Sequence, residues 1–348
     1  MVSLTGALVS LYHSSMRPPE TIHSGTRYEI GTAQGRRIRS LRLPPLHGID
    51  HSFGAECKRC VERWHPQMID EYKGMLCASG LPEDEFESYY FGRTAPYAGG
   101  CTNIAVTGDA TDNGTTLVGR NYDWAYVDKQ WCEARLITPT DEPRRIGYTH
   151  HWGGLCDAMN EYGVTICIAS LPAVGNVAPG LQWYIVVDLV MTRSTNVAEA
   201  VDILAAIPHV RSLSYLVVDA RNARLVEAAP NRVTVHAPER GILVGTNHRV
   251  GNDSIHDPRY EASRRRRERA LGLLNERVGQ IGREDIARVL ADHMGGICAG
   301  EYDVIRRRHV EDGGSGTIWS LLASPADRCF EIATGHPCST PFDGLQWR

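Results

Sequence analysis

The stretch from Tyr97 to Trp124, YAGGCTNIAVTGDATDNGTTLVGRNYDW, contains two runs in which apolar and polar residues alternate. Such alternation is typical of β-strands, and the Asn113-Gly114 pair between the runs is the strongest short-range signal for a tight hairpin turn. Pairing across that turn gives partner numbers that sum to about 223 to 227. We therefore expect Cys101 to lie opposite residues 122–126, with Asp123 as a neighbour and Arg120 nearby.

Two glycines, Gly99 and Gly100, come directly before Cys101. They let the backbone adopt the strained conformation that the thiol needs to attack its own preceding carbonyl. Cleavage of the Gly100-Cys101 bond would give Cys101 both a thiol and a free α-amine. An α-amine has an ordinary pKa of about 8, so it can serve as the general base for the thiol of its own residue. Asp123 and Arg120 would order these two groups and lower the pKa of the thiol.

Several motifs along the chain resemble one enzyme superfamily. GCTNIAV…GRNYDW is similar to the start of the mature catalytic chain in cysteine N-terminal nucleophile (Ntn) hydrolases of the choloylglycine hydrolase and penicillin (isopenicillin N) acyltransferase-like kind. The MNE turn of that superfamily is matched by Met159-Asn160-Glu161, and its strand-end asparagine by Gly245-Thr246-Asn247-His248. The C-terminal GSGTIWSLLASP…IATGHPC resembles the closing hairpin of the acyltransferase branch. Together the motifs cover most of residues 97–342, in the order of the superfamily.

The resemblance implies the α+β class, as a four-layer αββα sandwich of two mostly antiparallel sheets between helices. It implies that residues 1–100 form a mostly helical pro-segment, retained as a separate α chain that packs on the catalytic β chain, residues 101–348. Self-cleavage would expose Cys101 as the nucleophile, Asn247 would stabilise the oxyanion, and Asp123 with Arg120 would hold the amine and the sulfur.

The activity that the resemblance implies is cleavage or exchange of a linear, non-peptide amide in a small molecule. Water as the second nucleophile would make the enzyme an amidase, and an amine would make it an N-acyltransferase. This chemistry requires no metal and no organic cofactor, and we expect neither.

Further side chains are expected to bind the substrate. Ser170 stands where bile-salt hydrolases of the superfamily carry a second asparagine, and Tyr122 and Trp124 follow Arg120 on the expected strand. Four consecutive arginines, Arg264 to Arg267, overlie the place of a site arginine that follows a serine. We expect Arg264 to be the one that faces the site.

The composition excludes several other classes of protein. The net charge of −4 over 348 residues provides no basic field for nucleic acid or for an anionic membrane surface. The sequence has no run of about 18 apolar residues, and its first residues lack the pattern of a signal peptide, so we expect a cytoplasmic enzyme. Its ten cysteines are expected to be mainly buried thiols, Cys57 and Cys60 included. The sequence leaves the oligomeric state open.

Apolar spacing predicts the remaining elements more coarsely. Residues 1–46 are expected to form an irregular arm with a strand at 27–30, followed by helices over 53–79 that Pro66 interrupts. Further helices are expected over 181–207 and 260–278. Short strands are expected to make up much of the rest, because alternating runs recur between Gly, Pro, Asn and Asp residues.

Two other functions stay open at this point. Cys101 could belong to an unprocessed papain-like hydrolase in which one of the fourteen histidines is the base. Alternatively, the chain could be a non-catalytic binding protein on the same scaffold, with Cys101 never becoming N-terminal.

Overall fold

The computed structural model describes most of the chain, and the structural statements below refer to that part. The described residues are 16–17, 19–41, 50–94, 100–150, 154–173, 176–251, 260–303, 308–311 and 313–347. The first part of the expected arm, residues 1–15, and Gly99 lie outside them.

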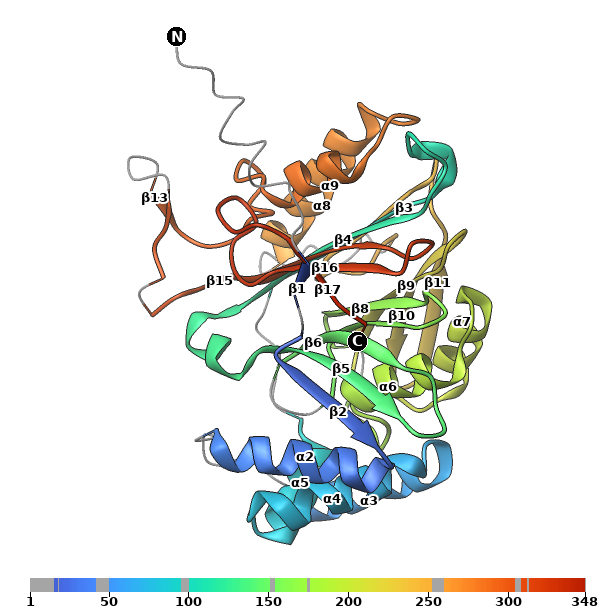
Figure 1. Cartoon of the computed structure of the whole chain (residues 1–348). Helices are drawn as coiled ribbons and strands as arrows, with labels where there is room; N and C mark the ends of the chain where they lie inside the picture. The colour runs from blue at the N-terminus through green and yellow to red at the C-terminus, as the bar shows by residue number, and fades with distance from the viewer. Residues whose placement is uncertain are drawn as a thin grey trace.

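Two large β-sheets lie face to face between layers of helices (Figure 1). The first sheet has the order β1 (Met16–Arg17), β17 (Asp343–Leu345), β16 (Cys329–Ala333), β15 (Ser315–Ser324), β4 (Leu117–Ala125), β3 (Cys101–Val106) and β12 (Ile242–Gly245). The second has the order β11 (Arg232–His236), β10 (Ala223–Ala229), β9 (Leu213–Val218), β8 (Thr165–Ser170), β7 (Asp157–Asn160), β6 (Arg145–Thr149), β5 (Glu133–Pro139) and β2 (Thr21–Gly25). A separate small ribbon pairs β13 (Tyr302–Asp303) with β14 (Arg308–His309).

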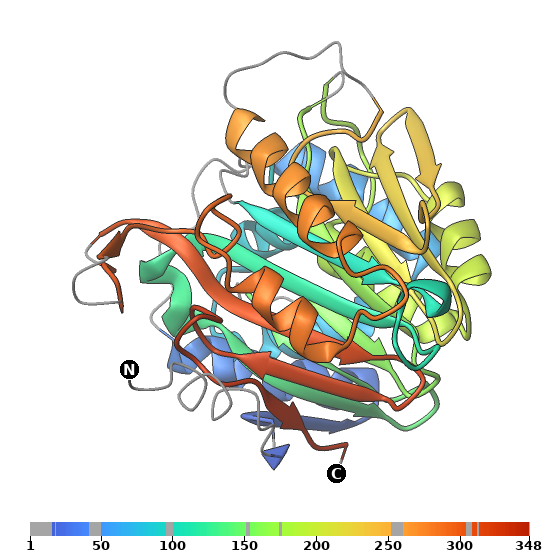
Figure 2. The same cartoon turned by 90° about the horizontal axis from the view of Figure 1, so that it is seen from above.

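Helices cover the outer face of each sheet. The first sheet packs against α8 (Glu261–Asn275) and α9 (Arg283–Leu290), which lie across β3 and β4 in Figure 2. The second packs against α6 (Trp183–Arg193) and α7 (Val197–Ala206). The expected four-layer αββα sandwich is therefore confirmed. Its two large sheets are antiparallel except where β1 meets β17 and β2 meets β5.

The hairpin around Cys101 has the expected register but not the expected turn. Cys101 pairs with Tyr122. The last pair is Val106 with Leu117, so a loop joins the strands where a tight turn at Asn113-Gly114 was expected. This loop contains a short 3-10 helix, Gly108–Ala110, and its backbone bonds to Gly279 and Ile281 at the approach to α9. Those tertiary bonds, which no local signal indicates, account for the longer connection.

The expected strand at 27–30 is wrong, because a helix begins there. Thr26 caps α2 (Arg27–Ser40) in a reciprocal capping box with Glu29, and the strand, β2, ends just before it. Gly31 of α2 faces the backbone of Glu71 so closely that a methyl group there would clash. The helix therefore buries a surface that the 27–30 pattern alone did not reveal.

Four helices of the first hundred residues form a group beside the second sheet, at the bottom of Figure 1. They are α2, α3 (His51–Trp64), α4 (Gln67–Ser79) and α5 (Glu83–Gly92), and the break between α3 and α4 confirms the interruption expected at Pro66. The expected helices over 181–207 and 260–278 are also confirmed, the first as the separate helices α6 and α7. No helix among the described residues is long and apolar enough to cross a bilayer.

A buried ionic cluster fastens this helical group to the body. Arg27 of α2 ion-pairs with Glu71 of α4 at 2.5 Å and with Asp188 of α6 at 2.7 Å, and it also pairs with Glu142. Asp188 accepts a second arginine, Arg145 of β6, at 2.6 Å. We call these five side chains the Arg27 cluster.

Candidate active site

Strand register brings Cys101 and Asn247 together. On β12 and β3, Gly245 is the partner of Asn103, so the chain beyond Gly245 runs alongside Cys101. Asn247 lies two residues further on, and its Oδ1 accepts a hydrogen bond from the backbone N–H of Cys101 at 2.6 Å. The expected proximity of Cys101 and Asn247 is thus present in the structure.

The orientation of the Asn247 amide is fixed by two partners of opposite character. Arg266, which can only donate, reaches Oδ1 at 2.7 Å. The backbone carbonyl of Ser170, which can only accept, receives Nδ2 at 3.1 Å, and so does the Ser170 hydroxyl, also at 3.1 Å. The amide therefore links the first sheet to the end of β8 in the second sheet, and Ser170 lies at the site as expected.

Asp123 lies against the residue that precedes Cys101. The backbone N–H of Asp123 donates to the carbonyl of Gly100 at 2.9 Å. A Cβ at position 100 would lie only 2.7 Å from Asp123 Oδ2, so a larger residue there would push the carboxylate away. Thr317 of β15 donates to Oδ1 at 2.7 Å, whereas Oδ2 is buried with no hydrogen-bond donor among the described residues.

Burial raises the pKa of the Asp123 carboxyl above its ordinary value, and the charges of Arg266 and Arg120 and the bond from Thr317 oppose that rise. The carboxylate is therefore held in a place where it gains from a nearby cation. A free α-amine on Cys101 would be such a cation.

Arg120 lies on the face of β4 that points between the sheets, where its ion-pair partner is Asp157. Its Nε lies 2.6 Å from Asp157 Oδ2, and both side chains are completely buried. Trp319 donates to the same carboxylate at 2.8 Å. Arg120 lies near Cys101, as expected, and the charge of its guanidinium lowers the pKa of the Cys101 thiol.

In the continuous chain burial raises the pKa of the Cys101 thiol above its ordinary value, while the charge of Arg120 lowers it and that of Asp123 raises it. The loss of hydration outweighs the one nearby cation. The lower pKa expected once cleavage frees the amine of Cys101 stays a prediction.

The structure corrects the choice among the four arginines. Arg264 ion-pairs with Glu261 at 3.1 Å on the outer side of α8. Arg266 is buried and bonds to Asn247. Ser263, three residues before Arg266 and thus on the same helix face, accepts from the backbone N–H of Asn247 at 2.7 Å. The sequence pattern placed the arginine directly after the serine, whereas in the structure the buried arginine lies one helix turn after it.

The two aromatic residues expected in the pocket are largely engaged with protein. Tyr122 stacks on Trp319 with ring centroids 3.8 Å apart, and its hydroxyl lies 2.8 Å from His150 Nδ1. Trp124 donates to Asp128. Tyr122 is buried and Trp124 half-buried, so Trp124 is the better placed of the two to meet a ligand.

Sequence reasoning missed three residues that complete the site: Asp157, Arg266 and Thr317. Asp157 begins the strand DAMN, next to Ala158 and Met159, and a charged residue beside apolar ones in a strand is a signal for a buried partner. Thr317 follows Gly316 in the quoted C-terminal motif. Neither signal identifies the partner, because the pairs come from different strands.

A family model described as acyl-coenzyme A:6-aminopenicillanic acid acyl-transferase matches residues 110–338, which include Asp123 and Asn247 but begin after Cys101. No curated protein sequence matches the chain.

Three solved structures are similar. An N-acylethanolamine-hydrolyzing acid amidase ortholog from Caenorhabditis elegans has 16% identity, a TM-score of 0.47, and coverage of 66% of this chain and 96% of its own. A mutant conjugated bile acid hydrolase from Clostridium perfringens has 13% identity, a TM-score of 0.46, and coverage of 71% and 97%. Penicillin V acylase from Agrobacterium tumefaciens has 15% identity, a TM-score of 0.47, and coverage of 67% and 83%.

Proposed function

Because this chain belongs to the acyl-coenzyme A:6-aminopenicillanic acid acyl-transferase family, we propose that it is a self-processing amidase or N-acyltransferase with Cys101 as nucleophile. Its substrate is a small molecule with a linear amide or another activated acyl group. The observation that carries the proposal is the set of partners around one backbone nitrogen. The nitrogen of Cys101 bonds to Asn247, and Asp123 and Arg266 lie beside it.

Self-cleavage would begin at the Gly100 carbonyl. The thiol sulfur of Cys101 adds to that carbon, and the N–H of Asp123, already bonded to the oxygen at 2.9 Å, stabilises the developing negative charge. The C–N bond then breaks, the nitrogen takes up the proton that the thiol released, and a thioester joins Gly100 to Cys101. Water hydrolyses the thioester, which leaves a carboxylate on Gly100 and a free thiol and amine on Cys101.

In the mature enzyme the freed amine would stay where the peptide nitrogen lies now. Asn247 Oδ1 accepts from it, and Asp123 Oδ2, which lacks a donor among the described residues, pairs with it when it is protonated. The amine takes the proton of the thiol as the sulfur attacks the substrate carbonyl and returns it to the leaving amine. The acyl group then passes from Cys101 to water or to an acceptor amine.

Asn247 Nδ2 is the proposed donor to the substrate oxyanion. In the continuous chain it bonds to Ser170, so the substrate oxygen must replace one of the two Ser170 oxygens as its acceptor. Arg266, buried and with no hydrogen-bond partner for Nε among the described residues, takes the substrate-binding role expected for Arg264. Ser170 and Trp124 are the proposed pocket contacts.

The Arg27 cluster supports retention of the first hundred residues after cleavage. Arg27 and Glu71 belong to the segment before Cys101, and Asp188, Glu142 and Arg145 to the segment after it. Separation of the segments would break the pairs of Arg27 with Glu142 and Asp188 and would expose the apolar side chains of the helices that pack in the main core, which is unfavourable. We therefore propose a mature enzyme of two tightly associated chains, 1–100 and 101–348.

The papain-like alternative lacks its base in this geometry. The described partners of Cys101 are Asn247 and Arg120, and neither is a histidine. His248, the closest histidine in sequence to Asn247, bonds instead to Thr246 and Ser263. Burial, with the charges of nearby arginines, lowers the pKa of His248 to about 4.

Intact-mass analysis and N-terminal sequencing of the purified protein test the proposal. We expect two chains of about 11 and 27 kDa, the larger beginning Cys-Thr-Asn. Cys101→Ala should give one uncleaved and inactive chain, whereas Cys329→Ala, a partly buried thiol on β16, should be cleaved like the wild type. An active wild-type enzyme with an uncleaved chain contradicts self-processing.

A substrate screen tests the activity separately. N-acyl amino acids, conjugated bile acids and penicillins with linear side-chain amides are to be offered to the wild type and to Cys101→Ala, with and without an acceptor amine. Release of amine that requires Cys101 supports the amidase, and transfer to the added amine supports the acyltransferase. Release of amine by Cys101→Ala at the wild-type rate would exclude Cys101 as the nucleophile.

A further inference from the structure

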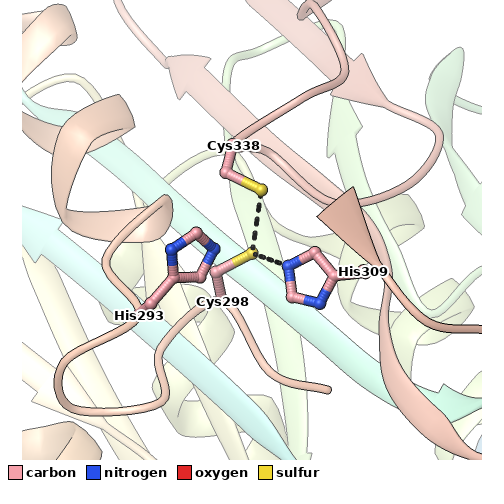
Figure 3. Close-up of side chains that lie close together, drawn as sticks. All are labelled: His293, Cys298, His309 and Cys338. Carbon is pink, nitrogen blue, oxygen red and sulfur yellow. Dashed lines mark hydrogen bonds between the residues drawn. The ribbon is translucent and has the colours of Figure 1, made fainter. Parts of the chain in front are cut away.

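A second cluster of reactive side chains lies outside the site described above. His293, Cys298, His309 and Cys338 each offer one ligand atom, and all four atoms lie within 4.8 Å of one another. Figure 3 shows the sulfur of Cys298 in the middle of the group, with the other three side chains directed toward it. They come from the segment after α9, from β14 and from the loop after β16, so three separate segments meet here.

Two of the distances between these atoms match a tetrahedral metal site. With Zn–S bonds of about 2.3 Å and Zn–N bonds of about 2.0–2.1 Å, tetrahedral angles place two sulfurs about 3.8 Å apart and a sulfur and a nitrogen about 3.5 Å apart. The sulfurs of Cys298 and Cys338 are 3.7 Å apart, and Cys298 Sγ lies 3.3 Å from His309 Nε2. A disulfide would need a separation of about 2.05 Å.

We propose that His293, Cys298, His309 and Cys338 bind one Zn²⁺ ion. Two thiolates and two imidazoles at tetrahedral spacing are the ligand set of structural zinc, and the absence of an oxygen ligand from this set disfavours magnesium and calcium. Four protein ligands leave no open position for a substrate. The site is therefore structural.

Neighbouring side chains support the ligands. His336 stacks on His309 with ring centroids 3.4 Å apart and an interplanar angle of 4°, and its Nδ1 lies 3.8 Å from Cys298 Sγ. Its other nitrogen lies 3.3 Å from Glu311 Oε1. Such outer contacts are typical of metal sites, because they orient the ligands before the ion arrives.

The zinc site is linked to Asp123 through one short chain of contacts. Ala299, next to Cys298, bonds to Thr317 twice: its N–H donates to the Thr317 hydroxyl at 3.0 Å, and its carbonyl accepts from the Thr317 N–H at 3.1 Å. The same hydroxyl donates to Asp123 at 2.7 Å. The ion thus holds the loop that positions Thr317, and Thr317 positions the carboxylate beside Cys101. This consequence rests on the proposed function, whereas the metal site does not.

Elemental analysis of untagged protein, purified without chelator and in the presence of reductant, tests the site. We expect about one zinc per chain in the wild type, in Cys101→Ala and in Cys329→Ser, and less than about a tenth of that in Cys298→Ser and Cys338→Ser. Cys329 is the matched control because it is a partly buried thiol of the same C-terminal region outside the cluster. Zinc that stays at wild-type content in both cluster variants would overturn the proposal.

Cobalt substitution keeps the test decisive if the serine variants do not fold. Wild-type protein stripped with a chelator and titrated with Co²⁺ should develop the visible bands of tetrahedral cobalt and a thiolate-to-metal charge-transfer band, saturating at one equivalent. No spectral change, or a Cys298–Cys338 disulfide found by peptide mapping of protein purified without reductant, would overturn the site.

The link to Asp123 is tested by following self-cleavage in the absence and in the presence of zinc. Newly synthesised chain made without zinc should cleave at Gly100-Cys101 at least about tenfold more slowly than zinc-loaded chain, and added zinc should restore the rate. Equal rates would reject the link and leave the metal site standing. Failure of all chains to cleave, with zinc bound, would instead contradict the proposed function.

Discussion

Two buried ionic groups in this molecule differ in how completely their charges are paired. In the Arg27 cluster both oxygens of each carboxylate have a partner. Glu71 accepts from Gln34 and Arg27, and both oxygens of Glu142 accept from Arg27. One oxygen of Asp188 is paired with Arg145, and the other with Arg27 and His65. At Cys101, one oxygen of Asp123 is buried without a donor among the described residues.

The difference indicates what each group does. Carboxylates that are already paired can only hold segments together, because they have no capacity for another donor. An unsaturated buried carboxylate is unfavourable unless a cation or a ligand completes it. The Arg27 cluster is therefore an attachment between segments, and the group at Cys101 is a site that is ready to receive a charge.

The largest expected effect comes from breaking the saturated cluster. Burial alone would raise the pKa of Asp188, but Arg145 and Arg27 hold it well below its ordinary value. Asp188→Ala leaves two buried arginines without this partner, and we expect the free energy of unfolding to fall by about 3–5 kcal/mol. Urea denaturation of the Cys101→Ala background measures it in one uncleaved chain. Asp70→Ala, whose carboxylate pairs with Lys73 on an exposed turn of α4, is the control and should change stability by less than about 1 kcal/mol.

The same cluster gives an acid dependence of stability. Because the pKa of Asp188 is lower in the folded chain than in the unfolded one, its contribution is complete above the ordinary carboxyl pKa of about 3.9 and is lost as the pH falls toward the folded value. Asp188→Asn should flatten this part of the stability curve. A parallel curve would show that the contribution of Asp188 is small.

The next prediction concerns the group at Cys101. Asn247→Ala removes the acceptor of the Cys101 nitrogen and the proposed oxyanion donor, and we expect turnover of processed enzyme to fall by about 10²- to 10³-fold. Its effect on the free energy of unfolding should be smaller than that of Asp188→Ala. Steady-state kinetics and urea denaturation on the same preparations give both numbers. If Asn247→Ala loses stability but keeps its turnover, Asn247 holds segments of the chain together and is not part of the site.

The elements that the sequence predicted are those fixed by local pattern. The alternation in CTNIAV and LVGRNYDW sets a register with Cys101 opposite Tyr122, and Pro66 breaks the helix where it was expected. Motifs in the order of a known family identified Asn247. Each of these signals lies within a few residues of the feature it predicts.

The features that escaped prediction depend on contacts between distant segments. Asp157 meets Arg120 across two sheets, and Arg266 meets Asn247 from a helix one turn beyond the serine. The four proposed zinc ligands show no short spacing of the Cys-x-x-Cys kind in the sequence. The first and the last of them, His293 and Cys338, are 45 positions apart. Only the fold brings such residues together.

Arg266 and Arg264 form a matched pair for a smaller effect. A hydrogen bond from a charged donor contributes about 1.5–3 kcal/mol, so Arg266→Ala should slow turnover by about 10- to 150-fold. Arg264→Ala breaks a partly exposed pair with Glu261 and should leave turnover within about twofold. Kinetics of both variants measure the ratio. The reverse order of effects would restore the arginine chosen from the sequence.

The smallest effect is the dependence of self-cleavage on pH. Because burial raises the pKa of the Cys101 thiol above its ordinary value in the continuous chain, the reactive thiolate is a minor species at neutral pH and its fraction grows as the pH rises. The first-order cleavage rate of newly synthesised chain should therefore rise with pH by up to about tenfold per unit, without levelling off below about pH 9. Denaturing electrophoresis of a cell-free synthesis reaction follows this rate, with Cys329→Ala as a control that should give the same profile. A rate that is already constant by about pH 7 would mean that Arg120 outweighs burial and that the thiol is ionised before cleavage, as a lowered pKa requires. The first outcome indicates a site whose charges are balanced only after cleavage frees the amine. The second indicates a site whose charges are already balanced in the uncleaved chain, as they are in the Arg27 cluster.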